Sequence, residues 1–81
     1  MRITILAFAR LRDALGASRL ERELPDGATV ETAWARLAAE FPADAPLRAS
    51  LAAAVNEEFT RFDRALEDGD EVALLPPVSG G

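Results

Sequence analysis

The stretch TVETAWARLAAEFP, residues 29–42, decides the fold of this chain. Its apolar residues recur every three or four positions, which places them along one face of an amphipathic helix. Thr29 stands where a helix N-cap is preferred, and Pro42 follows the expected last turn. Thr32 occupies the position at which a capping box prefers Glu, so we expect the helix start to be only half specified. The predicted apolar stripe, and with it one side of the core, consists of Val30, Ala33, Trp34, Leu37, Ala38 and Phe41.

Strand-like segments precede this helix. Residues 2–8 are mostly apolar with a β-branched start, and predict a strand that is covered on both faces and central in its sheet. Residues 9–15 predict one or two helical turns that end at Gly16. Residues 19–24 alternate charged side chains with Leu, which is typical of a strand with one solvent-exposed face, and Pro-Asp-Gly at 25–27 predicts a turn.

The second half of the chain predicts further short elements. Residues 47–53 favour a short second helix, although Ala-rich sequence fits several states. Residues 54–59 indicate a strand that runs through a tight turn, and residues 61–66 continue across the surface. Glu-Asp-Gly-Asp at 67–70 is a strong turn signal, and residues 71–75 predict the last strand.

The order of these elements favours an α+β fold. A strand that follows a crossover helix can lie parallel to an earlier strand, and the right-handed rule leaves few arrangements. The economical one is a β-grasp, in which one main helix crosses a mixed sheet whose first and last strands are adjacent at its centre. We therefore expect a β-grasp domain over residues 1–75 and an extended tail over residues 76–81.

Composition excludes several classes of function. The chain has 81 residues and no Cys or His, and all of its 9 basic residues are Arg, which removes thiolate, imidazole and lysine chemistry. We expect no bound metal, because Asp68 and Asp70 are explained better by the turn than by ligation. The net charge of −5 argues against nucleic-acid binding and suits a basic protein partner. With no leader or membrane span expected, we predict a cytoplasmic protein.

The tail, Pro-Pro-Val-Ser-Gly-Gly over residues 76–81, has the most distinctive chemistry of the chain. Its two prolines fix φ and favour an extended path away from the domain. Its two glycines carry no side chain, so they can enter a channel that is too narrow for other residues. This pattern predicts that the tail acts inside the active site of another protein.

The sequence resembles the small, sulfur-carrying subunit of molybdopterin synthase, a ubiquitin-like β-grasp family. The most specific evidence is LEDGDEVA at 66–73 followed by PPVSGG at 76–81. FARLRD at 8–13, with Gly16, and AVN at 54–56 support it, and the likeness covers nearly the whole chain.

The resemblance implies that the chain is a sulfur donor with no catalytic side chain of its own. An adenylating enzyme would use ATP to activate the carboxylate of Gly81, and a sulfur donor would then convert it to a thiocarboxylate. No cofactor would be bound by the chain itself, since it has no Gly-rich loop followed by Lys. The sulfur would pass to cyclic pyranopterin monophosphate and form the dithiolene of molybdopterin, with the catalytic side chains on the large subunit.

The resemblance also implies which residues meet the large subunit. The two proteins would form a heterotetramer that contains each subunit in duplicate. The tail residues expected in the partner's active site are Pro76, Pro77, Val78, Ser79, Gly80 and Gly81, and those expected at the partner interface are Phe8, Leu75, Arg12 and Phe59.

Other functions remain open on the sequence alone. A carrier for thiamine biosynthesis or for thiolation of transfer RNA would use the same tail with a different acceptor. A ubiquitin-like modifier would join the same tail to amines of target proteins. Detection of an isopeptide link to another protein would favour the modifier.

Overall fold

A computed structural model describes residues 1–76 of the chain. The amphipathic stretch forms helix α2, Val30–Glu40, as the apolar spacing predicts. Its start is better specified than expected, because the Thr32 hydroxyl replaces the missing carboxylate. Thr32 Oγ1 accepts from the Thr29 N–H at 3.0 Å, and Thr29 Oγ1 accepts from the Thr32 N–H at 3.3 Å. Two threonines thus complete a reciprocal capping box.

The strands form one mixed sheet in the order β2-β1-β5-β3-β4. β1 and β5 are neighbours and run parallel, with Ile5 opposite Val72 and Ala7 opposite Leu74. All other pairs of neighbouring strands are antiparallel, so the β-grasp prediction is confirmed. The strands are β1 (Arg2–Ala7), β2 (Arg19–Glu23), β3 (Ala52–Val55), β4 (Glu58–Thr60) and β5 (Glu71–Leu75).

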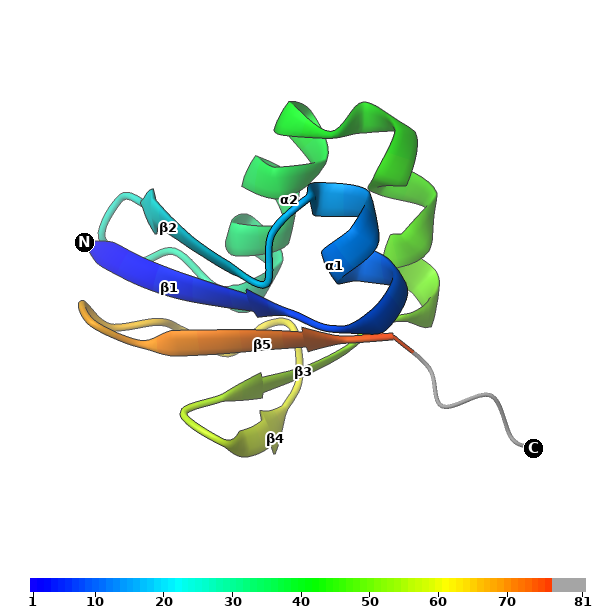
Figure 1. Ribbon diagram of the computed structural model, residues 1–81. Coiled ribbons are helices and arrows are strands. Elements are labelled where there is room, and N and C mark those ends of the chain that lie inside the picture. Colours follow the sequence, from blue (N-terminus) through cyan, green and yellow to red (C-terminus); the bar gives the residue numbers. More distant parts are fainter. Residues whose placement is uncertain (77–81) are drawn as a thin grey trace.

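The helices lie on one side of this sheet (Figure 1). Besides α2, they are α1, Ala9–Leu15, and the 3₁₀ helix η1, Pro42–Ser50. α1 ends at Gly16 with φ of 75°, a left-handed conformation that glycine adopts without strain and that the sequence pattern predicts. No helix within residues 1–76 combines the length and apolar character needed to cross a bilayer.

The prediction that the first strand is covered on both faces is wrong. In β1 the side chains of Ile3 and Ile5 are fully buried, whereas those of Thr4 and Leu6 are only half-buried. The reason is that the described helices pack against one face only, and an apolar run in the sequence does not tell which face they choose. The central strand of the five is β5, with β1 beside it.

The short helix predicted over residues 47–53 is confirmed only for residues 47–50, as part of a 3₁₀ helix, and its end is wrong. η1 ends at Ser50, and Ala52–Val55 forms β3, which pairs with β5 through Ala53 opposite Leu74. Pro46 lies inside η1 and has no N–H to donate, which disfavours a regular α-helix there. The alanines that follow have weak local preference, so pairing with β5 decides their conformation.

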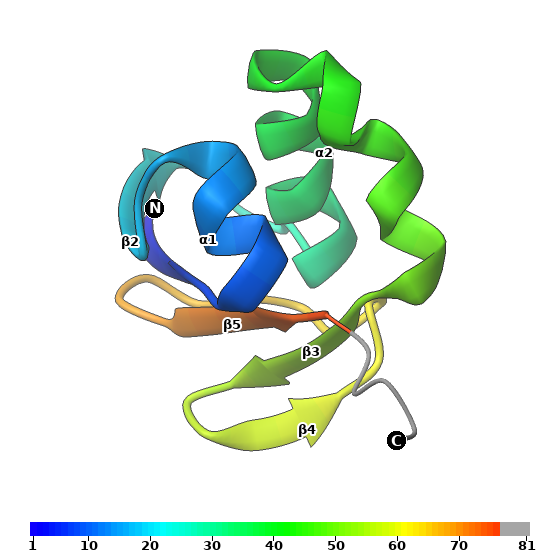
Figure 2. The same cartoon turned by 45° about the vertical axis from the view of Figure 1, so that its right-hand side comes forward.

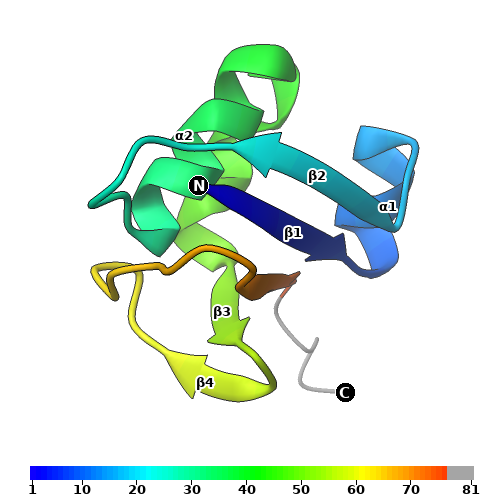
Figure 3. The same cartoon turned by 90° about the vertical axis from the view of Figure 1, so that its left-hand side faces the viewer.

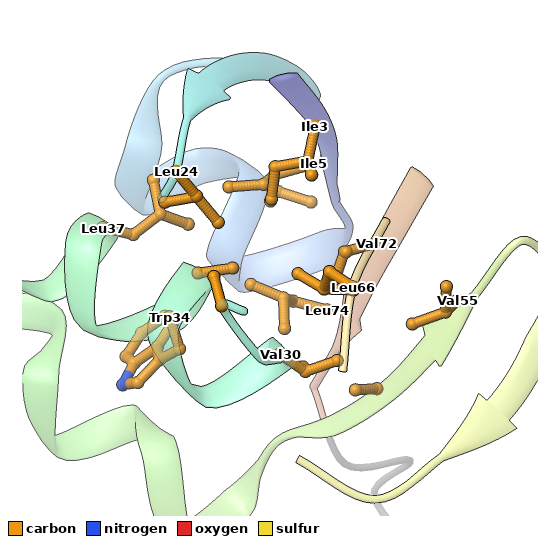
Figure 4. Close-up of a cluster of buried hydrophobic side chains, with 14 of the residues drawn as sticks. Ile3, Ile5, Leu24, Val30, Trp34, Leu37, Val55, Leu66, Val72 and Leu74 are labelled. Atoms are coloured by element: carbon orange, nitrogen blue, oxygen red, sulfur yellow. The ribbon is translucent and has the colours of Figure 1, made fainter. Parts of the chain in front are cut away.

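The core lies between α2 and the sheet (Figure 4). Side chains of α2, including Val30 and Leu37, face those of β1 and β5, including Ile5 and Leu74, and all four have no exposed surface. Trp34 is 4% exposed and belongs to the same cluster, as its place in the stripe predicts. This packing fixes β5, the strand that leads into the tail.

Candidate functional site

β5 is paired on both sides up to Leu74 and on one side at Leu75, the residue before the tail. Leu74 lies opposite Ala7 of β1 and Ala53 of β3, and Leu75 lies opposite Ala52 of β3. Pro76 follows directly and has no N–H with which to extend either ladder. The chain therefore leaves the sheet at Pro76 from its central strand, beside the start of α1 (Figure 2).

The opposite end of β5 is tied down by hydrogen bonds. Asp68 Oδ1 accepts from the Arg2 N–H at 2.7 Å, and Asp70 Oδ2 accepts from the Glu67 N–H at 2.8 Å. Asn56 Nδ2 donates to Asp70 Oδ1 at 3.0 Å, linking the turn to the β3–β4 hairpin. Figure 3 faces this end and shows the turn near the start of β1. The two aspartates act as turn acceptors, as predicted, and the strand is held firmly where it begins.

The face of the sheet away from the helices carries a row of apolar residues. Residues opposite each other in neighbouring strands point to the same face. The register joins Leu6 to Ala73, Ala73 to Ala54, and Ala54 to Phe59. Leu75 and its partner Ala52 stand on the same face, closer to the tail. We call these six residues the open-face patch: Leu6, Ala52, Ala54, Phe59, Ala73 and Leu75.

Phe59 is the most exposed large apolar side chain of this patch, at 76%. An exposed aromatic ring within an apolar row is typical of a protein-binding surface. The other half of the open face is charged and carries ion pairs, including Arg19 with Glu71 at 3.7 Å. The apolar half is the one nearer the tail.

The structure brings Phe8 and Leu75 to the same end of the sheet. Phe8 directly follows Ala7, the partner of Leu74, and is 43% exposed. It is the N-cap of α1 in an extended conformation, and Ala9 after it has φ of 48°, an unusual value for alanine. Phe8 therefore lies just beyond the end of β1, at the end of the sheet where the tail departs.

Arg12 does not join the open-face patch. It lies on α1 in the helical layer, where its Nε is 3.7 Å from Asp13 Oδ1. Of the predicted interface residues, Leu75 and Phe59 share one face and Phe8 adjoins it at the tail end. Arg12 belongs to a separate part of the surface around the tail.

Sequence reasoning did not assign Leu6, Ala54 and Ala73 to the open face, where Leu6 and Ala73 are half-buried and Ala54 is buried. Leu6 was assigned to a covered face, and alanine carries little signal of its own. The cross-strand register that aligns them with Phe59 would have identified them, once the order of strands was known. The remaining predicted tail residues, Pro77, Val78, Ser79, Gly80 and Gly81, lie outside the described residues.

Comparison with protein families gives a match to the ThiS family over residues 5–81. The molybdopterin synthase sulfur carrier subunit of Chlamydomonas reinhardtii is 41% identical over 83 aligned positions, covering 100% of both chains. The subunit of the same name from Escherichia coli is 42% identical, covering 98% of this chain and 99% of the relative.

Solved structures have the same fold. The putative molybdopterin converting factor, subunit 1, from Pyrococcus furiosus superposes with a TM-score of 0.86 at 29% identity, covering 96% of this chain and 99% of that one. The small archaeal modifier protein 1 of H. volcanii superposes with a TM-score of 0.85 at 27% identity, covering 95% and 98%. The family match and the full-length likeness agree, and the chain belongs to the ThiS family, among the molybdopterin synthase sulfur carrier subunits.

Proposed function

We propose that this chain carries sulfur as a thiocarboxylate on Gly81 and donates it to a pterin precursor in molybdenum cofactor biosynthesis. A terminal carboxylate is ionised at neutral pH and is a poor electrophile. An adenylating enzyme therefore joins it to AMP with release of pyrophosphate from ATP. A sulfur donor then displaces AMP and leaves sulfur in place of one carboxylate oxygen.

The observation that carries this proposal is the departure of the tail from the central strand. β5 is paired on both sides up to Leu74 and on one side at Leu75, and Pro76 follows without a linker. Residues 77–81 span at most about 17 Å when extended, at roughly 3.3–3.6 Å a residue. A partner that accepts this tail must therefore bind the body of the domain close to Pro76. The rigid strand and the two prolines reduce the entropy lost when the tail is ordered.

The open-face patch is the surface we assign to the large subunit of molybdopterin synthase. It is apolar, exposes Phe59 and ends at the foot of the tail. The net charge of −5 favours approach to a basic surface that surrounds the partner's active site. We infer a heterotetramer with each subunit in duplicate, assembled in the cytoplasm, with the catalytic side chains on the large subunit.

Removal of Gly81 tests the proposal. The shortened chain keeps every described element, so we expect unchanged folding and near-normal affinity for the large subunit, but no formation of the dithiolene. An Ala35→Ser variant, which changes an exposed residue of α2 and leaves the whole tail intact, serves as the control and should retain activity. Continued dithiolene formation by the shortened chain would refute the carrier role.

The intact mass of protein taken from cells gives a second, independent test. A fraction of the chains should have one oxygen exchanged for sulfur, and this fraction should disappear when the adenylating enzyme is deleted. A mass that never changes under either condition would contradict the proposal.

A second candidate function is that of a ubiquitin-like modifier, which the likeness to small archaeal modifier protein 1 favours. The adenylated carboxyl group of Gly81 would then be attacked by a lysine amine of another protein, forming an isopeptide bond and releasing AMP. Since this chain has no lysine, it would modify targets singly and would not extend itself through its side chains. Trypsin cuts this chain last after Arg64, so tryptic peptides whose lysine carries residues 65–81 as a branch would support this function, and their absence from cells that form thiocarboxylate would exclude it.

A further inference from the structure

A small hollow lies at the foot of the tail, lined by residues of α1 and η1 and by Leu51 and Pro76. Its volume is about 40 Å³. Three leucines line it, of which Leu11 is buried and Leu47 and Leu51 are half-buried. Its other lining residues are the exposed Arg10 and Ser50 and the half-buried Pro76. The hollow therefore has an apolar interior and a polar edge.

The charge available at this edge is positive. Within residues 1–76, Arg12 forms an ion pair with Asp13, and Arg48 forms one with Glu31, whereas Arg10 forms none. Ser50 Oγ donates its hydrogen bond to the Leu47 carbonyl at 2.9 Å. The guanidinium of Arg10 is thus a cationic group in a chain whose net charge is −5. A ligand group that suits this edge is a carboxylate.

Any enzyme that acts on the tail would also cover the hollow, because the hollow lies beside Pro76. Pro76 forms part of its wall and adjoins Leu75 of the open-face patch. Because residues 77–81 reach about 17 Å at most, a protein whose active site holds Gly81 must cover the surface around Pro76. The hollow is therefore continuous with the surface that we assign to the large subunit.

We propose that the large subunit inserts a short branched aliphatic side chain, such as that of Val, into this hollow and places a carboxylate against Arg10. The size agrees, since a water-sized group needs roughly 10–15 Å³ and the hollow has room for about three such groups. This inference rests on the proposed function, because it takes its partner from there. It adds a specificity contact on the helical side of the tail, next to the end of the open-face patch at Leu75.

Two variants test the two halves of the contact. Ser50→Phe fills the hollow from its exposed edge, and Arg10→Glu reverses its charge. Calorimetry with the large subunit from the same organism should show affinity about tenfold weaker for each, the scale of losing one well-packed interface contact.

Matched controls separate this contact from general effects of bulk and charge. Ala49→Phe adds the same ring to a neighbouring exposed residue of η1 that does not line the hollow. Arg36→Glu makes the same charge reversal on the exposed face of α2. Both should bind within about twofold of the unchanged protein, an effect below about 0.5 kcal/mol. Thermal unfolding of all four variants checks that the domain remains folded.

The proposal requires that both variants weaken binding. Unchanged affinity of either variant overturns it, because the hollow or the charge then has no occupant. A defect confined to adenylation assigns the hollow to the activating enzyme instead and also overturns it. Removal of residues 78–81 should leave the methyl NMR signals of Leu47 and Leu51 in the free protein unchanged, since a shift would place the chain's own tail in the hollow.

Failure of the underlying function has a different signature. In that case the unchanged protein does not bind the large subunit at all, or the chain without Gly81 still supports dithiolene formation. Binding by the unchanged protein, with no loss in the Ser50→Phe and Arg10→Glu variants, refutes only the role of the hollow.

Discussion

The two faces of the sheet differ in what covers them, and β5 shows the difference within two residues. Leu74 points toward the helices and has no exposed surface, whereas Leu75 points to the open face and is half-buried. Both are leucines in a strand anchored on both sides. The covered face stabilises the domain, and we assign the open face to the binding of the large subunit.

The contrast explains why alanines are frequent on the open face. Ala54 and Ala73 lie opposite each other between the larger side chains of Leu6 and Phe59. Because these alanines have short side chains, a partner could approach the backbone of the sheet closely at this position. Phe59 is the large exposed side chain of the row. On the covered face, the same strands carry Val72, Leu74 and Val55, which fill the core under α2.

Truncation of the two leucines should have opposite consequences. Leu74→Ala removes fully buried atoms and leaves a cavity, so we expect a loss of about 2–5 kcal/mol in the free energy of unfolding. Leu75→Ala should cost less than about 1 kcal/mol in stability and weaken binding to the large subunit instead. Urea denaturation and calorimetry measure the two quantities. Equal destabilisation by both variants would contradict the distinction between the faces.

Replacement of Phe59 should affect binding alone. Phe59→Ser removes an exposed ring, so the free energy of unfolding should change by no more than about 0.5 kcal/mol. Affinity for the large subunit should fall tenfold or more, about 1.4 kcal/mol, as expected for an aromatic residue buried on binding. Glu58→Gln, at the preceding position of the same short strand, is the control and should bind normally. Normal binding by Phe59→Ser would remove the open-face patch from the interface.

The hairpin that carries Phe59 can be made more stable without altering the patch. Asn56 and Glu57 both have positive φ, 50° and 70°, and the second position of such a turn favours glycine. Glu57→Gly should therefore raise the free energy of unfolding by about 1 kcal/mol. Glu57→Ala, which keeps a Cβ in the left-handed conformation, should show no such gain. Thermal or urea unfolding would decide, and equal stability of the two variants would exclude backbone strain as the cause.

The smallest effect concerns the ion pair that joins η1 to α2 on the covered side. Arg48 Nη2 lies 2.7 Å from Glu31 Oε1, and its guanidinium lies over the Phe62 ring. Hydrogen bonding from Arg48 lowers the pKa of Glu31 below its ordinary value of 4.5. A depressed pKa in the folded state means that the stabilisation is complete above about pH 4.5 and is lost as pH falls through the folded-state value.

Because this pair is half-exposed, its contribution should be no more than about 0.5 kcal/mol. Below pH 4.5, the free energy of unfolding should therefore fall less in Glu31→Gln than in the unchanged protein, by no more than about 0.5 kcal/mol. Binding to the large subunit should be unchanged. Chemical denaturation across this pH range measures the slope. An unchanged slope would show that the pair contributes nothing.

Particular residues show how far the sequence could predict the fold and the site. The apolar spacing through Trp34 and Leu37 identified α2, and the acidic turn and Gly16 were located correctly. The start of β3 at Ala52 and the exposure of Leu6 were not, because neither depends on local preference. Phe8, Phe59 and Leu75 were chosen from the resemblance, and the structure shows that Leu75 and Phe59 share a face, whereas Arg12 lies elsewhere.

The sequence by itself determined the chemistry of this protein and the nature of its principal elements. Helical and strand periods are properties of neighbouring residues, and the residue types present are read directly from the sequence, which has no Lys, Cys or His. Only the tertiary structure decided which face of the sheet stays open and where the hollow beside Arg10 forms. Both depend on contacts between segments far apart in the chain, chiefly the packing of the helices on one side of β1 and β5, which no local pattern encodes.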